Sequence, residues 1–433
     1  MIWNKAESAP REEIESTQIE RLQETARRVY AINPFYKQKF DELDILPEDI
    51  KSIEDIKRLP FTKKQDLRDH YPFGLFCVPM SEVVRVHSSS GTTGKPTVVG
   101  YNAHDMKVWG EVMARVYTMS GANADDVVHN GYGYGLFTGG LGFHYGAEHV
   151  GATVVPASGG FTDRQLMLMR DFGATVLACT PSFALHMAEV AARAGNDFQK
   201  DYKLKSGIFG AEPTSPGLKA EVAKAWGIKY HEVYGLSEII GPGVSCSCEH
   251  SDRLHIFEDH FLAEIIDPKT GETMPDGERG ELVITTLTKQ ALPIIRYRTG
   301  DITSIVKEPC KCGRTHARME SIVGRADDML IVNGVNIYPS QVEHVIANSD
   351  GVTLNYQIIA DKKGHLDKLE IMVEMNDELL AHGEEEKQKT TKSIQADLLN
   401  NLYINAKVNL VEPRTIERSM GKAIRVIDKR VEK

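Results

Sequence analysis

The sequence predicts an α/β protein that is divided into at least two domains. Its 433 residues exceed the roughly 250–300 residues that one hydrophobic core usually holds. Between residues 82 and 240, short apolar runs typical of strands alternate with helical segments, which favours a sheet with helical crossovers. From residue 253 to 306 the pattern changes to strands joined by tight turns, and an α+β pattern follows.

The first 70 residues are predicted to be mostly helical. The segment 12–30 is rich in helix formers, and Ile19, Leu22 and Ala26 recur at the spacing of one helix face. The segment 62–67, Thr-Lys-Lys-Gln-Asp-Leu, is typical of a capped helix start. A helical layer is therefore expected before the first strand.

The central stretch supplies the predicted sheet, because apolar runs of strand length recur along it. The expected strands are 82–86, 97–101, 152–155, 174–178 and 207–210, and the expected helices are 163–172 and 182–194.

A more antiparallel β subdomain is expected at about 245–320. The turn 276–280, Asp-Gly-Glu-Arg-Gly, precedes the strand 281–285. The last hundred or so residues are within the normal size of a separate domain. Their expected elements are strands at 352–360 and 369–374, a turn at Lys363-Gly364 and a helix at 384–401 whose charged start is a solvated face.

Composition excludes several classes of function. The formal net charge of −10 argues against nucleic acid or an anionic membrane as the main partner. No stretch approaches about 18 uninterrupted apolar residues, and the first residues lack the apolar core of a signal peptide. Six cysteines in so long a chain argue against a disulfide framework. The sequence predicts a cytoplasmic enzyme, with a homodimer as one option.

The segment Ser88-Ser89-Ser90-Gly91-Thr92-Thr93-Gly94-Lys95-Pro96-Thr97 is the strongest single motif. Glycines allow close approach of the backbone to a ligand, hydroxyls supply donors, and Lys95 supplies a mobile positive charge. The expected strands on both sides make it a flexible flap that suits a nucleotide triphosphate. A P-loop is disfavoured, because Ser89 replaces its first glycine and Pro96 opposes a helix start. The alternative is a surface turn of small residues.

Four further motifs follow this segment in a fixed order. They are Tyr234-Gly235-Leu236-Ser237-Glu238, Tyr297-Arg298-Thr299-Gly300-Asp301, Gly324-Arg325-Ala326-Asp327-Asp328-Met329 and Met420-Gly421-Lys422. With the flap, this series resembles the adenylate-forming superfamily of acyl-CoA synthetases, adenylation domains and luciferases. That resemblance implies a large N-terminal domain, 1–326, and a small mobile C-terminal domain, 327–433, with a hinge at Asp327.

Finer details resemble the phenylacetate–CoA ligase family. They are Asn333-Gly334-Val335-Asn336 followed by Pro339-Ser340-Gln341-Val342-Glu343, the run Glu258-Asp259-His260-Phe261, and the run Thr285-Thr286-Leu287-Thr288-Lys289. Gly300 departs from the arginine that many members of this family have. The resemblance implies an AMP-forming enzyme that activates an aromatic acid with ATP and Mg²⁺ and transfers the acyl group to coenzyme A.

The roles of individual residues also follow from the resemblance. Lys422 is expected to contact the α-phosphate and the acid during adenylation, and Glu238 to hold Mg²⁺. Asp301 is expected to bind the ribose hydroxyls, with Arg325 at the ribose or phosphate and Tyr234 stacked on adenine. The complete expected ATP site is Ser88, Ser89, Thr92, Thr93, Lys95, Gly210, Ala211, Glu212, Pro213, Tyr234, Gly235, Ser237, Asp301 and Arg325.

Each of these roles has a structural alternative. Lys422 can be a surface lysine, and Glu238 a carboxylate at a helix start. Asp301 can be a turn residue, Arg325 half of a weak surface ion pair, and Tyr234 a core side chain.

The segment 131–145 is the expected pocket for the acid. It interleaves glycines with aromatic residues and contains no lysine, arginine or carboxylate. Flat apolar walls favour an aromatic acid whose only charge is its carboxylate. The expected lining is Tyr134, Phe137 and Gly139, and the alternative is a glycine-rich helix start packed in the core.

Two C-x-C pairs, 246–248 and 310–312, indicate a metal site. Zinc favours four cysteine or histidine ligands, and four protein ligands make a site structural. Resemblance to some phenylacetate ligases selects Cys248, His255, Cys310 and Cys312, with Cys246 and His316 as reserves. Reduced cysteines without metal are the alternative. Cys77 and Cys179 are expected to be buried apolar residues.

Two rival functions stay open on the sequence alone. One is an aryl adenylating enzyme that loads a carrier protein instead of coenzyme A. The other is a non-catalytic nucleotide-binding protein on the same fold. The exact aromatic acid also stays open.

Overall fold

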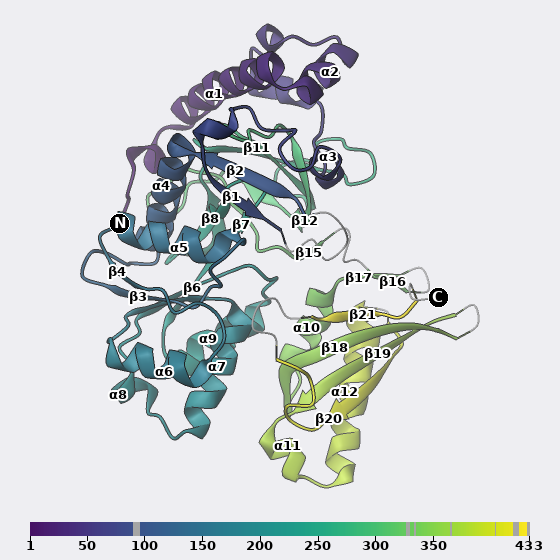
Figure 1. Cartoon of the computed structure of the whole chain (residues 1–433). Coiled ribbons are helices and arrows are strands. Elements are labelled where there is room, and N and C mark those ends of the chain that lie inside the picture. Colours follow the sequence, from purple (N-terminus) through teal and green to yellow (C-terminus); the bar gives the residue numbers. More distant parts are fainter. Residues whose placement is uncertain are drawn as a thin grey trace.

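The computed structural model describes residues 1–89, 96–325, 330–332, 335–363, 366–402, 404–418 and 424–430 (Figure 1). The predicted site residues that lie outside these ranges are Thr92, Thr93, Lys95, Asp327 and Lys422. Among the described helices, none combines the length and apolar character that a membrane span requires.

The predicted N-terminal helical layer is confirmed. Helix α1 buries Leu22 and Ala26 in a cluster with Leu262 and Ile295, so the layer packs against a sheet built about 240 residues later in the chain (Figure 1). Its elements are η1 (Lys5–Ser8), α1 (Arg11–Ile32), α2 (Pro34–Glu42), η2 (Pro47–Asp49), η3 (Ile53–Arg58), α3 (Lys64–Asp69) and η4 (Met80–Glu82).

The helix predicted to start in segment 62–67 is α3. The carboxylate of Asp66 accepts a hydrogen bond of 2.7 Å from the backbone N–H of Lys63, which satisfies one donor at the helix start. Thr62 is buried, and its hydroxyl donates a hydrogen bond of 2.6 Å to the carbonyl of Ile295. Thr62 thus ties the helix start to the core.

A nine-stranded sheet forms the centre of the large part of the molecule. Its order is β13-β14-β9-β8-β7-β6-β5-β3-β4, with parallel pairing from β4 to β7 and antiparallel pairing from β7 to β13. Its strands are β3 (Val127–Asn130), β4 (Thr153–Val155), β5 (Val176–Cys179), β6 (Ser206–Phe209), β7 (Lys229–Leu236), β8 (Gly241–Cys248), β9 (Ser251–Ile256), β13 (Ile305–Val306) and β14 (Arg318–Met319).

The predicted helical crossovers accompany the parallel half of this sheet. Every residue of β5 and β6 is buried, as expected for parallel strands covered on both faces. The helices are α4 (Ala103–Met119), α5 (Thr138–His149), α6 (Thr162–Asp171), α7 (Pro181–Arg193), α8 (Phe198–Asp201) and α9 (Pro216–Trp226).

Two smaller antiparallel sheets complete the large part. The order of the four-stranded sheet is β10-β11-β12-β15, formed by β10 (Phe261–Ile266), β11 (Gly280–Thr286), β12 (Tyr297–Thr303) and β15 (Gly324–Arg325). The strands of segment 245–320 therefore belong to two sheets. Strands β10, β11 and β12 are in the four-stranded sheet, whereas β8, β9, β13 and β14 extend the central one. The second small sheet is the hairpin of β1 (Val83–Ser88) and β2 (Val98–Asn102), and it confirms the antiparallel strands predicted around the flap.

The C-terminal strands and helix are also where the sequence predicts them. Figure 1 shows this unit in green and yellow beside α7 and α9, and Leu218 and Val222 of α9 share a buried cluster with Val345 and Ile346. Its main sheet has the order β20-β19-β18-β21. The elements are β16 (Leu330–Val332), β17 (Val335–Ile337), α10 (Pro339–Ala347), β18 (Val352–Lys363), β19 (Leu366–Met375), α11 (Asp377–Ala381), α12 (Glu384–Leu402), β20 (Ala406–Val411) and β21 (Val426–Asp428).

Candidate active site

Three of the predicted ATP-binding residues meet at one carboxylate. The hydroxyl of Tyr234, from β7, donates a hydrogen bond of 2.6 Å to Oδ2 of Asp301 in β12. Arg325, from β15, donates one of 2.8 Å from Nη1 to Oδ1 of the same carboxylate. Burial and then the charge of Asp301 raise the pKa of Tyr234 well above 10, so its hydroxyl stays a donor. A carboxylate offers about four acceptor positions, which is the chemistry that the diol of a ribose requires.

Glu238 lies directly after β7 and is buried. The hydroxyl of Thr97, at the end of the flap, donates a hydrogen bond of 3.3 Å to its Oε1. Burial and then the charge of Glu238 raise the pKa of Tyr297 well above its usual range, and Tyr297 is in the same strand as Asp301. The structure therefore brings Thr97 of the flap, Glu238 and Asp301 into one region.

A buried lysine beside Glu238 was not among the predicted site residues. The ammonium of Lys289 lies 3.4 Å from the carbonyl oxygen of Glu238 and 4.6 Å from the centre of the Tyr101 ring. Burial lowers the pKa of Lys289 to about 8, against the charges of Asp105 and Glu238, which favour the ammonium. The only local signal was a lysine that interrupts an apolar segment, and that pattern is common on surfaces.

The first residue of the flap, Ser88, contacts the segment expected to bind the acid. The N–H of Ser88 donates a hydrogen bond of 3.0 Å to the carbonyl of Leu136. Ser89 and Thr97 close the base of the flap, because the N–H of Ser89 donates to the carbonyl of Thr97 and the N–H of Thr97 donates to Oγ of Ser89, both at 3.0 Å. The phosphate and acid regions are thus adjacent.

The glycines of segment 131–145 divide into two groups. A Cβ added to Gly142 would lie 2.6 Å from Pro242, and one added to Gly146 would lie 2.5 Å from Met113. These glycines allow α5 to pack closely, as the structural alternative expects. At Gly133 and Gly135, by contrast, no described atom lies within 4 Å of the added Cβ, so the open space of the motif is at its beginning.

The three expected acid-pocket residues surround this open part unequally. Tyr134 is partly buried, and its hydroxyl accepts a hydrogen bond of 2.7 Å from Asn130. Gly139 lies against Tyr132, with 3.6 Å from an added Cβ to that ring. Phe137 is 55% exposed at the start of α5. The structure therefore buries Tyr134 in part, packs Gly139 against Tyr132 and leaves Phe137 exposed to solvent.

The segment 210–213 after β6 is fixed by close packing. A Cβ on Gly210 would lie 2.3 Å from the carbonyl oxygen of Val233, so a side chain there would displace the strand. Glu212 accepts hydrogen bonds of 2.6 Å from the N–H and 3.0 Å from Oγ of Ser182, at the start of α7. The expected adenine segment is therefore held by a helix N-terminus, which favours an anion. Ala211 adopts a left-handed φ of 72°, and Pro213 completes the turn.

Two residues of the 234–238 motif serve its shape. Gly235 pairs with Pro242 of β8 where the register of the ladder shifts. The hydroxyl of Ser237 lies 3.1 Å from that of Thr138 at the start of α5. These contacts set the direction in which Tyr234 and Glu238 leave the strand.

The predicted zinc ligands come together at one end of the central sheet. The ligand atoms of Cys248, His255, Cys310 and Cys312 all lie within 4.8 Å of one another. Sγ of Cys248 is 3.7 Å from Sγ of Cys310, and Sγ of Cys312 is 3.5 Å from Nε2 of His255. Tetrahedral zinc with Zn–S of about 2.3 Å and Zn–N of about 2.0 Å separates such pairs by about 3.8 and about 3.5 Å. The donor set and its spacing therefore fit zinc.

The reserve ligands do not join this cluster among the described residues. The thiol of Cys246 donates to the carbonyl of Ser247 at 3.3 Å. The register between β8 and β9 shifts between Ser247 and Cys248, which interrupts the alternation that would put both cysteines on one face. Nε2 of His316 lies 4.0 Å from Asp259.

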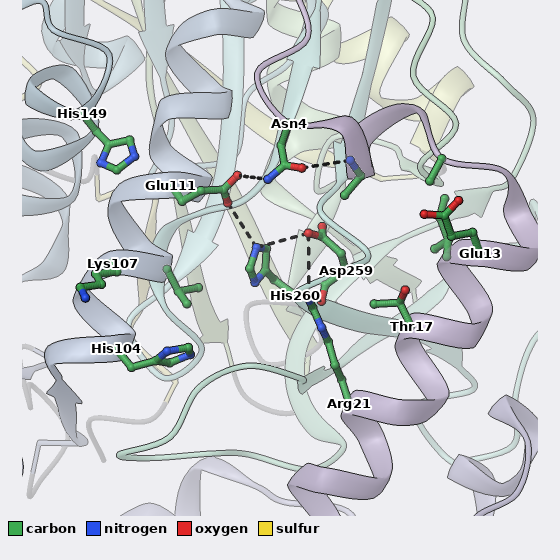
Figure 2. A pocket seen from close by; sticks show the side chains of 14 residues that line it. Asn4, Glu13, Thr17, Arg21, His104, Lys107, Glu111, His149, Asp259 and His260 are labelled. Carbon is green, nitrogen blue, oxygen red and sulfur yellow. Dashed lines mark hydrogen bonds and ion pairs between the residues drawn. The ribbon is translucent and has the colours of Figure 1, made fainter.

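A separate cavity of about 770 Å³ lies between α1, α4 and the start of β10. Figure 2 shows Asp259 and His260 between Glu111 of α4 and Arg21 of α1. Against the effect of burial, the hydrogen bond from His260 and the charge of Arg115 lower the pKa of Glu111 to about 2. Arg115 also binds both oxygens of Asp259, at 2.7 and 2.8 Å.

The polar groups of this cavity balance one another. Its described lining contains none of the predicted ATP, acid or metal ligands. Asn4 donates a hydrogen bond of 2.9 Å to Glu111. Outside the cavity lining, Arg11 binds the carboxylate of Glu258 at 2.8 and 3.0 Å. The run Glu258-Asp259-His260-Phe261 thus attaches the N-terminal segment to the large sheet, which is a structural task.

Comparison with known proteins finds relatives over nearly the whole chain. The family of AMP-binding enzymes matches residues 18–288, and the AMP-binding enzyme C-terminal domain matches residues 334–430. The chain is 48% identical to the phenylacetate-coenzyme A ligase of Thermus thermophilus, over 99% of this chain and all of the relative. It is 44% identical to that of Escherichia coli, over 98% and 97% of the two chains.

Solved structures of 2-hydroxyisobutyryl-CoA ligase share the fold. In its postadenylation state with 2-HIB-AMP, this relative is 31% identical with a TM-score of 0.93, covering 98% of this chain and 92% of that chain. In its thioesterification state with 2-HIB-AMP and CoA, the TM-score is 0.73 at 32% identity, covering 99% and 92%. The chain therefore belongs to the AMP-binding enzyme family, in the branch that contains the phenylacetate-coenzyme A ligases.

Proposed function

We propose that the protein is an AMP-forming phenylacetate–coenzyme A ligase. The observation that carries this proposal is that Tyr234 and Arg325 both donate hydrogen bonds to the carboxylate of Asp301, close to buried Glu238. These four residues come from three separate motifs of an adenylate-forming enzyme. Relatives named phenylacetate-coenzyme A ligase match the chain almost end to end, which supports phenylacetate as the acid.

The reaction has two half-reactions. In the first, a carboxylate oxygen of the acid attacks the α-phosphorus of ATP, and pyrophosphate leaves with the electrons of the broken P–O bond. In the second, the sulfur of coenzyme A attacks the acyl carbon, loses its proton, and displaces AMP. The charge that develops on the phosphate oxygens makes electrostatic stabilisation the main requirement of the first step.

The residues divide this task as follows. Asp301 and Arg325 orient the ribose and its neighbouring phosphate, and Tyr234 lies against adenine. Glu238 would hold Mg²⁺, which prefers carboxylate oxygens and neutralises phosphate charge when bound. The roles of Thr92, Thr93 and Lys95 at the phosphates, of Lys422 in adenylation and of Asp327 as the hinge stay predictions of the resemblance.

The site for the acid is proposed at the beginning of segment 131–145. Open space at Gly133 and Gly135, beside the partly buried ring of Tyr134, supports a flat apolar ligand there. Ser88 of the flap contacts Leu136 of this segment, which supports a position of the bound carboxylate near the α-phosphate. Phe137 becomes part of this lining only if its ring turns inward.

A structural zinc ion is proposed at Cys248, His255, Cys310 and Cys312. The observed spacing of sulfur and nitrogen supports tetrahedral coordination by four protein ligands, which leaves no open position for catalysis. The ion would join β8, β9 and the turn after β13. A cytoplasmic location, a homodimer and the domain boundary at 326/327 stay predictions of the sequence.

A panel of carboxylic acids tests the proposed activity. Purified protein is mixed with ATP, Mg²⁺ and phenylacetate, hydroxyphenylacetate, indoleacetate or benzoate, with and without coenzyme A. We expect pyrophosphate release that depends on the acid, is fastest with phenylacetate, and yields a thioester when coenzyme A is present. Thioester formation only on a carrier protein would favour the first rival function. Absence of acid-dependent pyrophosphate release would favour a non-catalytic nucleotide-binding protein.

A further inference from the structure

An ion pair links the two parts of the molecule, and its arginine is close in sequence to Lys422, the predicted catalytic residue. Arg418 precedes Lys422 by four residues in the sequence and belongs to the C-terminal part. Its Nη2 lies 3.7 Å from Oε2 of Glu189 on α7 of the large part. This separation is long for a hydrogen bond, so the contact acts through charge.

The guanidinium of Arg418 is held in place by its own part of the molecule. It donates hydrogen bonds of 2.8 and 2.7 Å to the two oxygens of Glu374, which is fully buried at the end of β19. The N–H of Ile416 donates one of 2.9 Å to the same carboxylate. Because these contacts are internal to the C-terminal part, Arg418 presents a pre-organised charge to α7.

A second contact lies on the other side of Lys422 in the sequence. Glu343 of α10 accepts a hydrogen bond of 3.2 Å from the N–H of Ser215, the N-cap of α9. Arg425 lies 3.8 Å from the same carboxylate of Glu343 and stacks on Tyr356 at 4.5 Å. Both flanks of the segment that contains Lys422 are therefore linked to contacts with the large part.

Opposite charges meet across this boundary where Glu189 faces Arg418. Glu189 of α7 and Glu221 of α9 are acidic, whereas Arg418 and Arg425 of the C-terminal part are basic. Burial and then the negative charges of Glu189 and Glu343 raise the pKa of Glu221, so the arginines are the groups that balance the acidic side chains here. Such complementarity favours one docking arrangement over others.

The solved relative differs from this chain to unequal degrees in its two states. Its postadenylation form superposes closely over the full length, and its thioesterification form does so much less closely at almost equal coverage. The contact between Glu189 and Arg418 thus belongs to the domain arrangement seen in the first of these two forms.

We propose that Glu189 docks Arg418 in the adenylate-forming arrangement only, and that Arg418 is a positioning residue for the Lys422 segment in the first half-reaction. This inference rests on the proposed function. The ion pair lies outside the ATP and acid sites, and it would affect the first half-reaction but not the second.

Measurement of the two half-reactions in Glu189→Gln tests the proposal. The first is followed as pyrophosphate release from ATP and phenylacetate, and the second as thioester formation from preformed phenylacetyl-AMP and coenzyme A. We expect adenylation to slow by about three- to fivefold, the range of a partly exposed ion pair, with thioester formation unchanged. Glu189→Asp, which retains the charge, is expected to recover part of the loss.

Salt supplies a readout that a merely structural role would not change. Added NaCl should slow adenylation by the wild-type protein towards the rate of Glu189→Gln and affect that variant less, because salt screens the pair. The matched control is Glu42→Gln, an exposed residue of α2 whose carboxylate accepts a hydrogen bond of 2.8 Å from Gln38 of its own helix.

The outcomes are distinguishable from failure of the proposed function. Wild-type protein that lacks acid-dependent pyrophosphate release would contradict the function itself. Active wild-type protein whose Glu189→Gln variant loses both half-reactions equally, or neither, would overturn the docking role while leaving the function intact.

Discussion

The hydroxyl of Tyr234 donates a hydrogen bond of 2.6 Å to Oδ2 of Asp301, and this contact joins the central sheet to the four-stranded sheet. Tyr234 lies in β7, the last strand of the parallel half of the first sheet, and Asp301 lies in β12 of the second sheet. A ligand bound at Asp301 is therefore held by both sheets. The same two residues belong to motifs that are more than 60 positions apart, as expected of a site built by tertiary structure.

Asp301→Asn is expected to weaken ATP binding. The amide keeps the shape of the side chain but loses the charge that pairs with Arg325 and accepts hydrogen bonds from the ribose. The KM for ATP should rise by about 10- to 100-fold, since a hydrogen bond to a charged group contributes roughly 1.5–3 kcal/mol. Tyr234→Phe, which removes one donor and keeps the ring, should show a smaller rise. An unchanged KM for ATP in Asp301→Asn would locate the ribose elsewhere.

Glu238→Gln is expected to change the dependence on Mg²⁺. The neutral amide is a poorer ligand for a hard cation than a carboxylate. The Mg²⁺ concentration for half-maximal pyrophosphate release should increase about tenfold or more, and saturating Mg²⁺ should restore part of the rate. Glu42→Gln serves as the control for loss of one negative charge. Identical Mg²⁺ curves for wild type and Glu238→Gln would remove Glu238 from the metal site.

Lys422→Ala is expected to separate the two half-reactions. Formation of the acyl-adenylate should be abolished, because the ammonium no longer balances charge at the α-phosphate and the carboxylate. Transfer of the acyl group from preformed phenylacetyl-AMP to coenzyme A should continue. The two rates are measured separately on the same preparation, and equal loss of both would contradict the assigned role.

Removal of the metal is expected to act on stability. Wild-type protein should hold about one zinc ion per chain, as four protein ligands at tetrahedral spacing predict. Cys312→Ser should lose the ion and unfold at a lower temperature, whereas Cys246→Ser should retain it, because Cys246 lies outside the ligand cluster. Elemental analysis and thermal unfolding measure these effects. Clearly less than one zinc per wild-type chain would speak against the site.

Lys289 should leave a signature in the pH dependence of stability. Its pKa in the folded chain is about 8, below its ordinary value of 10.5, so the unfolded chain binds more protons between these values. The contribution of Lys289 to the free energy of unfolding is complete above pH 10.5 and is lost as the pH falls to about 8. The change corresponds to about 3 kcal/mol at most, at roughly 1.4 kcal/mol per pH unit.

Denaturant unfolding of wild type and Lys289→Met at several pH values measures this effect. The difference in stability, wild type minus variant, should increase as the pH rises from 8 towards 10. Taking the difference cancels the titration of buried tyrosines and cysteines that both proteins share. A difference that stays constant with pH would mean that Lys289 titrates normally in the folded chain.

Much of the fold follows from local sequence patterns. The N-terminal helices, the strands around the flap and the alternation between 152 and 210 are where periodicity predicts them. Each of these elements depends on side chains within a few turns or residues of one another, and local propensity is readable in a linear sequence. The ordered motifs likewise predicted that Tyr234, Asp301 and Arg325 act together, and the structure brings these three into contact.

The remaining features depend on which distant segments meet. The strands of segment 245–320 divide between two sheets, because pairing partners and sheet edges are chosen by long-range packing. Similarly, the irregular register at Ser247 admits Cys248 to the metal cluster and leaves Cys246 outside it.

By itself, the sequence determined the order of motifs, the types of local element and the chemistry of adenylation. Only the tertiary structure decided that Lys289 is buried beside Glu238, that Gly142 and Gly146 serve helix packing, and that Glu189 meets Arg418. Burial and charge pairing are properties of neighbours in space, and a residue's neighbours along the chain do not specify them.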